Sequence, residues 1–204
     1  MNSFAFGLGG SFLNRLFIVA LGLVALSACS SPQPWHVKDI SGLMPDLTFT
    51  LTDTEGRTVR GTDYRNQIIL VYFGYTHCPD VCPTTLARLS SALKKMGPTA
   101  HHVRVLFVTV DPARDTPELL RGYARYFGPQ ITALRGTDEQ LQSFTKRYRV
   151  TYSRGEPDAD GEYPVSHSNA VFVFGGDGRV RLMIRSDDSV DAIAADLSRL
   201  VTTG

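Results

Sequence analysis

The chain has 204 residues, of which 43% are hydrophobic and 20% are charged, a composition typical of one globular domain with room for a short extra segment. Lys and Arg number 21 and Asp and Glu number 20, which gives a net charge of +1. This near-neutral balance lacks the excess of basic residues that is typical of a nucleic-acid-binding protein. Aromatic and branched residues are spread along the whole chain, which excludes an intrinsically disordered protein. Three cysteines are too few for a disulfide scaffold.

The first segment is typical of an export signal. Residues 1–28 contain no acid and a single base, Arg15, and residues 16–28 (LFIVALGLVALSA) are apolar and uncharged. A membrane-spanning helix needs about 20 apolar residues, which favours a cleaved signal over a permanent span. The sequence LSAC, which ends at Cys29, resembles the bacterial lipobox, in which the cysteine receives a lipid; a plain secreted protein is the alternative. Residues 29–45 are then expected to form a lipidated, flexible tether before a domain over 46–204.

Strands and helices alternate along the remaining chain. Strands are expected at residues 47–51, 57–59, 68–73, 103–110, 170–174 and 180–184, from alternating or continuous apolar runs separated by turn residues. Helices are expected from Pro83 to Met96, from Asp115 to Gly128, from the capping box at Thr137, and over a closing segment. The apolar residues predicted to face the core from the last two helices are Leu141, Phe144, Tyr148, Val190, Ile193, Leu197 and Leu200.

Two buried strands joined through a helix imply a parallel pair, and the later hairpin supplies an antiparallel edge. The predicted fold class is therefore α/β: a single thioredoxin-like domain with a mixed sheet, helices on both faces and an N-terminal β-hairpin.

Cys78 and Cys82 lie in the stretch FGYTHCPDVCP, where each cysteine precedes a proline. A residue before proline avoids the helical region, so both cysteines are expected in an irregular loop, with Pro83 opening the helix. The helix N-terminus is expected to favour a thiolate at Cys82, and a protonated His77 would add to this effect. A disulfide that closes so short a loop adds little stability, so a reactive role for the two cysteines is favoured over a purely structural disulfide. Their spacing is compatible both with a disulfide and with a metal site.

A third ligand would distinguish a metal site from a redox pair. His36 lies in the expected tether, and His101 and His102 lie in a polar turn. His167 is the strongest candidate because it precedes the 170–174 strand, which neighbours the cysteine-bearing strand in a thioredoxin-like sheet. The residues alone are compatible with two roles for His167: a metal ligand, or a loop histidine held by hydrogen bonds.

The run YFGYTHCPDVCP over residues 72–83 resembles the Sco/SenC family of copper-binding, thioredoxin-fold assembly factors. The run VDPARDTP over residues 110–117 resembles the second signature of that family, and the resemblance covers residues 46–201. It implies that Cys78, Cys82 and His167 bind one copper ion. The family often has Asp directly before the histidine, where this chain has Ser166, and this difference puts an acidic ligand at that position in doubt.

The ligand chemistry agrees with this resemblance. Two thiolates and an imidazole suit Cu(I), whereas structural zinc takes four protein ligands. Asp80 and Asp111 are candidate neighbours for Cu(II), although Asp111 also fits a simple turn after a strand.

The resemblance implies a periplasmic, membrane-tethered copper chaperone that delivers copper to the CuA site in the copper-bearing subunit of cytochrome c oxidase or a related haem–copper oxidase. Other periplasmic copper chaperones and thiol reductants are expected partners, and Cys78 and Cys82 would form a disulfide when oxidised. One alternative is a thiol–disulfide reductase that uses the same two cysteines as catalytic residues. A second is a peroxide-reducing enzyme using Thr76 and Arg114, and a third is an inert scaffold lipoprotein. The acidic loop over residues 153–165 is expected either to contact a partner, to move on metal loading, or simply to be solvated.

Overall fold

The computed structural model describes residues 33–203, and contacts group Trp35–Gly204 into one unit. The predicted export signal over residues 1–28 and the lipidation site Cys29 lie outside the described residues. Within residues 33–203, every helix is too short or too polar to cross a bilayer.

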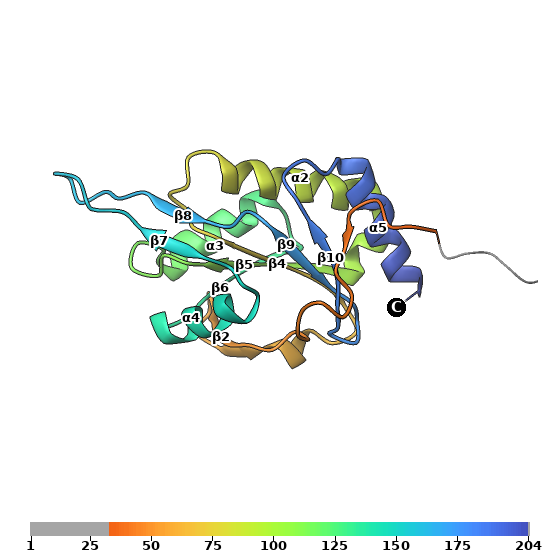
Figure 1. Ribbon diagram of the computed structural model, residues 1–204. Coiled ribbons are helices and arrows are strands. Elements are labelled where there is room, and N and C mark those ends of the chain that lie inside the picture. Colours follow the sequence, from red (N-terminus) through yellow and green to blue (C-terminus); the bar gives the residue numbers. More distant parts are fainter. Residues whose placement is uncertain (1–32, 204) are drawn as a thin grey trace, which may run out of the picture. The chain divides into compact units, whose positions relative to one another are not determined.

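An eight-stranded mixed sheet forms the centre of this unit, in the order β1-β10-β9-β4-β5-β6-β2-β3 (Figure 1). Strand β4 (Ile68–Gly74) runs parallel to β5 (Val103–Thr109), and helix α2 (Val81–Met96) connects them. Every residue of β4 is buried, as its continuous apolar run predicts. The parallel pair thus delivers the cysteine-bearing stretch to the carboxyl end of a central strand.

Strand β6 (Ile131–Arg135) was not among the predicted strands. It follows helix α3 (Pro117–Phe127) and pairs parallel with β5. Its five residues, ITALR, give too short an alternation to stand out next to the Gly128–Pro129 helix end. Pairing with a buried neighbour, rather than local pattern, makes this segment a strand.

The antiparallel strands lie at the two edges. Strands β9 (Val171–Phe174) and β10 (Val180–Ile184) form the expected hairpin beside β4. Strands β2 (Thr50–Asp53) and β3 (Thr58–Arg60) form the N-terminal hairpin at the opposite edge, slightly later in the sequence than predicted.

The predicted tether over residues 29–45 is wrong for its second half. Strand β1 (Lys38–Asp39) pairs with β10, and the side chains of Val37 and Ile40 are buried. The buried carboxylate of Asp196 accepts hydrogen bonds from the amides of His36 and Val37 at 2.8 Å. The folded unit therefore begins at Trp35, because these contacts tie the segment to the sheet and to helix α5 (Val190–Thr203).

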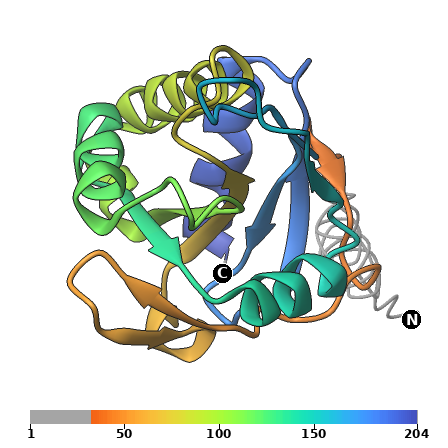
Figure 2. The same ribbon diagram turned by 90° about the vertical axis from the view of Figure 1, so that its left-hand side faces the viewer.

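Helices cover both faces of the sheet, which confirms the thioredoxin-like prediction (Figure 2). Helices α2, α3 and α5 lie over one face, and α4 (Asp138–Arg147) lies over the other. Thr137 caps α4 as its capping box predicted, and Thr116 caps α3. Phe144 of α4 packs on Phe73 of β4 with ring centroids 5.1 Å apart. Short 3-10 turns lie at Gly61–Tyr64 and Gly97–His102.

The polar segment over residues 153–165 is not simply a loop. Strands β7 (Tyr152–Arg154) and β8 (Val165–His167) pair antiparallel and form a separate two-stranded sheet, which extends beyond the main sheet in Figure 1. This hairpin places His167 at the end of β8, shortly before β9 begins at Val171.

Candidate metal centre

Three side chains far apart in the sequence converge at the carboxyl end of β4. Cys78, Cys82 and His167 each present one ligand atom, and these atoms lie within 4.8 Å of one another. The carboxyl ends of parallel strands are the usual place of functional sites in open α/β sheets. The structure therefore places together all three residues that the sequence proposed as metal ligands.

Cys82 lies inside helix α2, not in the irregular loop that the following proline predicted. The helix begins at Val81, so Cys82 and Pro83 occupy its first turn, where proline fits because its missing amide has no partner to lose. The Cys82 side chain is fully buried, and its sulfur lies against the backbone of Gly74.

Burial also corrects the expected reactivity of this thiol. Although Cys82 lies at a helix N-terminus, burial raises the pKa of its thiol to about 12. Desolvation of the sulfur outweighs the favourable dipole of the helix, so Cys82 is a protonated thiol at neutral pH in the absence of metal.

Cys78 lies in the turn before α2 and is only half-buried. The Cys82 amide donates a hydrogen bond to the Cys78 Sγ atom at 3.4 Å. Both cysteines are free thiols in this structure. Cys78 is therefore the sulfur that an approaching molecule meets first.

His167 is oriented for ligation through Nε2. Its Nδ1 lies 3.0 Å from the Ser168 carbonyl oxygen, which only accepts hydrogen bonds, so Nδ1 carries the proton. The other ring nitrogen, Nε2, lies 3.2 Å from the Cys82 Sγ atom and accepts from its thiol. Burial lowers the pKa of the His167 imidazole below its usual 6.5, so the ring is neutral at pH 7. Tyr75 contacts the ring edge-on, with centroids 5.8 Å apart.

The second motif supports the cysteine loop through Asp115. This carboxylate is fully buried and accepts hydrogen bonds from the Thr76 amide at 3.1 Å and from the Thr76 and Thr109 hydroxyls at 2.5 Å each. His77 Nδ1 lies 3.5 Å from the same carboxylate. Sequence reasoning had not given Asp115 this role, although the motif DPARDTP was the available signal.

Asp111 of the same motif holds the hairpin that carries His167. The buried Asp111 carboxylate accepts hydrogen bonds from the Tyr163 hydroxyl and from Arg114 Nε, each at 2.6 Å. The Arg114 guanidinium stacks 3.6 Å from the centre of the Tyr163 ring and bonds Glu162. Asp111 thus has a structural role through these hydrogen bonds. It is neither a simple turn residue nor a member of the ligand cluster. No sequence signal had pointed to Tyr163.

Other candidates from the sequence lie elsewhere. His36 bonds Asp196, while His101 and His102 are exposed in the 3-10 turn before β5. Asp80, the N-cap residue of α2, is exposed and accepts a hydrogen bond from Thr84. Ser166 is exposed in β8. The peroxide-reducing alternative relied on Thr76 and Arg114. Both side chains donate hydrogen bonds to buried carboxylates, Arg114 to Asp111 and Thr76 to Asp115.

The donor set fits a soft metal ion. Metal–sulfur and metal–nitrogen bonds of about 2.0–2.3 Å place two ligands of one ion at most about 4.6 Å apart, so small shifts would bring all three donors into one coordination sphere. Two sulfurs and one imidazole favour Cu(I) over Mg²⁺ or Ca²⁺, which prefer oxygen.

Comparison with known proteins agrees with the fold. The family model described as SCO1/SenC matches residues 44–202. The chain belongs to the SCO1/SenC family. It is 34% identical over 173 residues to the mitochondrial SCO2 homolog of Mus musculus, covering 81% of this chain and 68% of the relative. It is 38% identical over 132 residues to the mitochondrial SCO1 homolog of Homo sapiens, covering 64% of this chain and 44% of the relative.

Solved SCO1/SenC structures share the thioredoxin-like architecture. Copper-bound ScoI of Bradyrhizobium japonicum aligns with a TM-score of 0.69 and 35% identity, over 76% of this chain and 98% of that chain. Apo Sco1 of Thermus thermophilus aligns with a TM-score of 0.72 and 34% identity, over 84% of this chain and 99% of that chain. The chain spans about half the length of several mammalian relatives. It spans nearly the whole length of these two solved structures.

Proposed function

We propose that the protein is a copper chaperone that holds one copper ion between Cys78, Cys82 and His167. The observation that carries this proposal is the convergence of two sulfurs and one unprotonated imidazole nitrogen within 4.8 Å. The copper-bound state of the Bradyrhizobium japonicum relative, at 35% identity, supports it.

The three ligands have different roles in taking up and releasing the cargo. Buried Cys82 gives up its proton when the metal binds, because a bound metal stabilises the thiolate that burial disfavours. Neutral His167 binds without losing a proton. Half-buried Cys78 is the ligand that an incoming thiolate of the recipient reaches first, so transfer proceeds by ligand exchange from this side of the site.

We further propose that the recipient is the CuA site in the copper-bearing subunit of cytochrome c oxidase, or of a related haem–copper oxidase. A signal over residues 1–28 would direct export, and a lipid on Cys29 would anchor the protein at the periplasmic face of the membrane. A short tether to Trp35 would then keep the site close to membrane-bound recipients and raise its effective concentration there.

Anaerobic Cu(I) titration of the reduced full chain in detergent tests the copper site. One equivalent is expected to bind, and Cys78→Ser, Cys82→Ser and His167→Ala are each expected to weaken binding at least tenfold. His102→Ala removes an exposed histidine outside the cluster and serves as the matched control. Unchanged affinity in His167→Ala would overturn the three-ligand site.

A second candidate function is thiol–disulfide exchange, favoured by the two free thiols and the hydrogen bond between the Cys82 amide and the Cys78 sulfur. This chemistry needs both cysteines but not the imidazole. The two functions separate in His167→Ala: a chaperone loses copper binding, whereas a reductase retains its rate of reduction of a model disulfide.

A further inference from the structure

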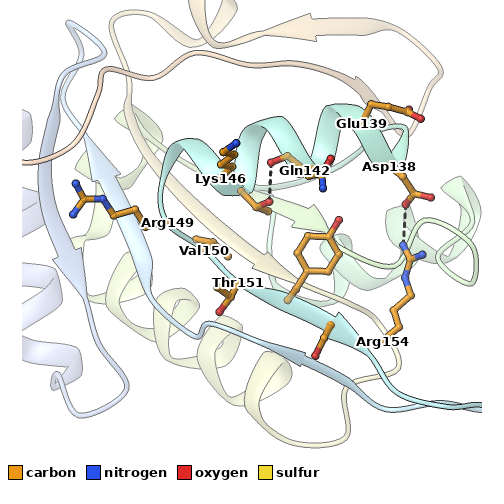
Figure 3. Close-up of a pocket in the computed structure, with 11 residues that line it drawn as sticks. Asp138, Glu139, Gln142, Lys146, Arg149, Val150, Thr151 and Arg154 are labelled. Atoms are coloured by element: carbon orange, nitrogen blue, oxygen red, sulfur yellow. Dashed lines mark hydrogen bonds and ion pairs between the residues drawn. The ribbon is translucent and has the colours of Figure 1, made fainter.

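An open groove of about 790 Å³ lies between helix α4 and strand β7. Strand β7 belongs to the β7–β8 hairpin, which carries His167. Figure 3 shows Gln142 and Lys146 on the α4 side and Thr151 and Arg154 on the other side. Arg154 bonds Asp138 of α4 at 3.0 Å and closes one end. The groove is open to solvent and most of its lining residues are polar or charged, unlike an enclosed pocket for a small molecule.

The wall formed by β7 is an edge strand with unused backbone groups. The Ser168 amide donates to Thr151 and the Gly155 amide donates to Pro164, which fixes the hydrogen-bonded pairs of the β7–β8 ladder. By the alternation of antiparallel strands, the backbone groups of Tyr152 and Arg154 point away from β8. The same alternation sends the Val165 amide out of the ladder on the other side, where it donates to Tyr75 at 3.5 Å.

On the β7 side, the outward amides and carbonyl oxygens of Tyr152 and Arg154 have no hydrogen-bond partner among residues 33–203. They present two amide donors and two carbonyl acceptors, the pattern that an added β-strand pairs with. A backbone edge of this kind recognises an extended chain rather than a folded surface or a small ligand.

Among the described residues, the charges of the groove that lack an ion pair differ in sign between its two ends. Glu139 is exposed at the first turn of α4, whereas Lys146 and Arg149 are exposed near its end. Neither Lys146 nor Arg149 forms an ion pair with another residue in the described part of the chain. An extended segment with an acidic residue at the Lys146 end would complete both the backbone and the charge pattern.

We propose that the α4–β7 groove docks an extended, acidic segment of the copper recipient by strand addition to β7. This inference rests on the proposed copper-chaperone function. Tyr152 pairs directly with His167 across the hairpin, so a strand added to β7 lies two strands from the imidazole and brings the body of the recipient to the metal site.

Copper transfer tests the proposal. The full chain in detergent, loaded with Cu(I), is mixed with the reduced, metal-free copper-binding domain of the oxidase subunit, and the second-order rate of transfer is measured. We expect a Lys146→Glu, Arg149→Glu double variant to bind Cu(I) as tightly as the wild type and to transfer it at least tenfold more slowly.

The matched control is the Lys94→Glu, Arg125→Glu double variant. It makes the same change of net charge at exposed positions on α2 and α3, outside the groove. We expect its transfer rate to lie within twofold of the wild type. Equal rates in the groove variant and this control would overturn the docking proposal while leaving copper binding intact. Failure of the wild type to bind Cu(I) would overturn the proposed function and this inference together.

Amide hydrogen exchange provides a second readout that a general structural effect would not reproduce. In the free protein the Tyr152 and Arg154 amides should exchange rapidly, and the Ser153 amide, which faces β8, should be protected. Saturation with the recipient domain should slow exchange at Tyr152 and Arg154 at least tenfold. Formation of the complex without such protection would overturn strand addition.

Discussion

A side chain on Gly74 would collide with the sulfur of Cys82. A Cβ atom at Gly74 would lie 2.8 Å from the Cys82 Sγ atom and 2.7 Å from the Phe107 ring. The absence of a side chain at the end of β4 therefore allows the buried thiol to approach the strand, which sets the position of one ligand.

Gly74→Ala should displace either the Cys82 sulfur or the Phe107 ring. Overpacking of this kind costs about 1–3 kcal/mol of unfolding free energy. We expect that loss in urea unfolding and at least a tenfold weaker Cu(I) affinity. Gly122→Ala is the control, because a Cβ atom there meets open space. An alanine at Gly74 that leaves copper affinity unchanged would show that the sulfur position is not critical.

Asp115→Asn should loosen the cysteine loop. The buried carboxylate accepts from Thr76 and Thr109, and an amide loses one acceptor oxygen and adds a donor without a partner. We expect a loss of about 1–3 kcal/mol in unfolding free energy and faster amide exchange at Thr76. Asp80→Asn, at an exposed cap, should change stability by less than about 0.5 kcal/mol. Equal effects of the two substitutions would refute the supporting role of Asp115.

Tyr163→Phe tests the anchoring of the hairpin. It removes the hydroxyl that donates to Asp111 and leaves a buried carboxylate oxygen with one partner fewer. We expect a cost of about 1–3 kcal/mol and weaker Cu(I) binding through His167, with the exchange chemistry of the two thiols unchanged. Tyr126→Phe removes a hydroxyl from a side chain that is 85% exposed and should have no effect. Copper affinity equal in the two variants would contradict this coupling.

The pH dependence of stability should include a contribution from His167. Burial lowers the pKa of the folded imidazole below 6.5, so below that pH the unfolded chain binds a proton that the folded chain does not. The metal-free, reduced protein should therefore lose stability as the pH falls from 7 to 5.5. His167→Gln should make this loss smaller, as measured by urea unfolding at both pH values. Identical pH dependence in the two proteins would argue against a neutral buried ring.

Thiol alkylation should distinguish the two cysteines. Cys78 is half-buried, whereas Cys82 is fully buried and its thiol pKa is raised to about 12. Iodoacetamide at pH 7.5 under anaerobic conditions should modify Cys78 at least tenfold faster, as followed by mass spectrometry of peptides. Faster modification of Cys82 would mean that the first turn of α2 opens in solution.

Local features of the sequence were sufficient for much of the fold. The continuous apolar run of β4, the threonine caps of α3 and α4, and the glycine turn between β9 and β10 each act within a few residues, so their elements agree with prediction. Strand β6 and the β7–β8 hairpin were missed because short, partly polar segments become strands only when a neighbour pairs with them.

For the site, the sequence by itself determined the two cysteines, a helix that opens beside them near Pro83, and the histidine that a family resemblance selects. Only the tertiary structure decided that Cys82 is a buried thiol, that Asp115 and Tyr163 hold the supporting loops, and that His167 meets a sulfur 85 residues away. The physical reason is that residue patterns report local conformation and burial, whereas desolvation and ligand convergence depend on which distant surfaces pack together.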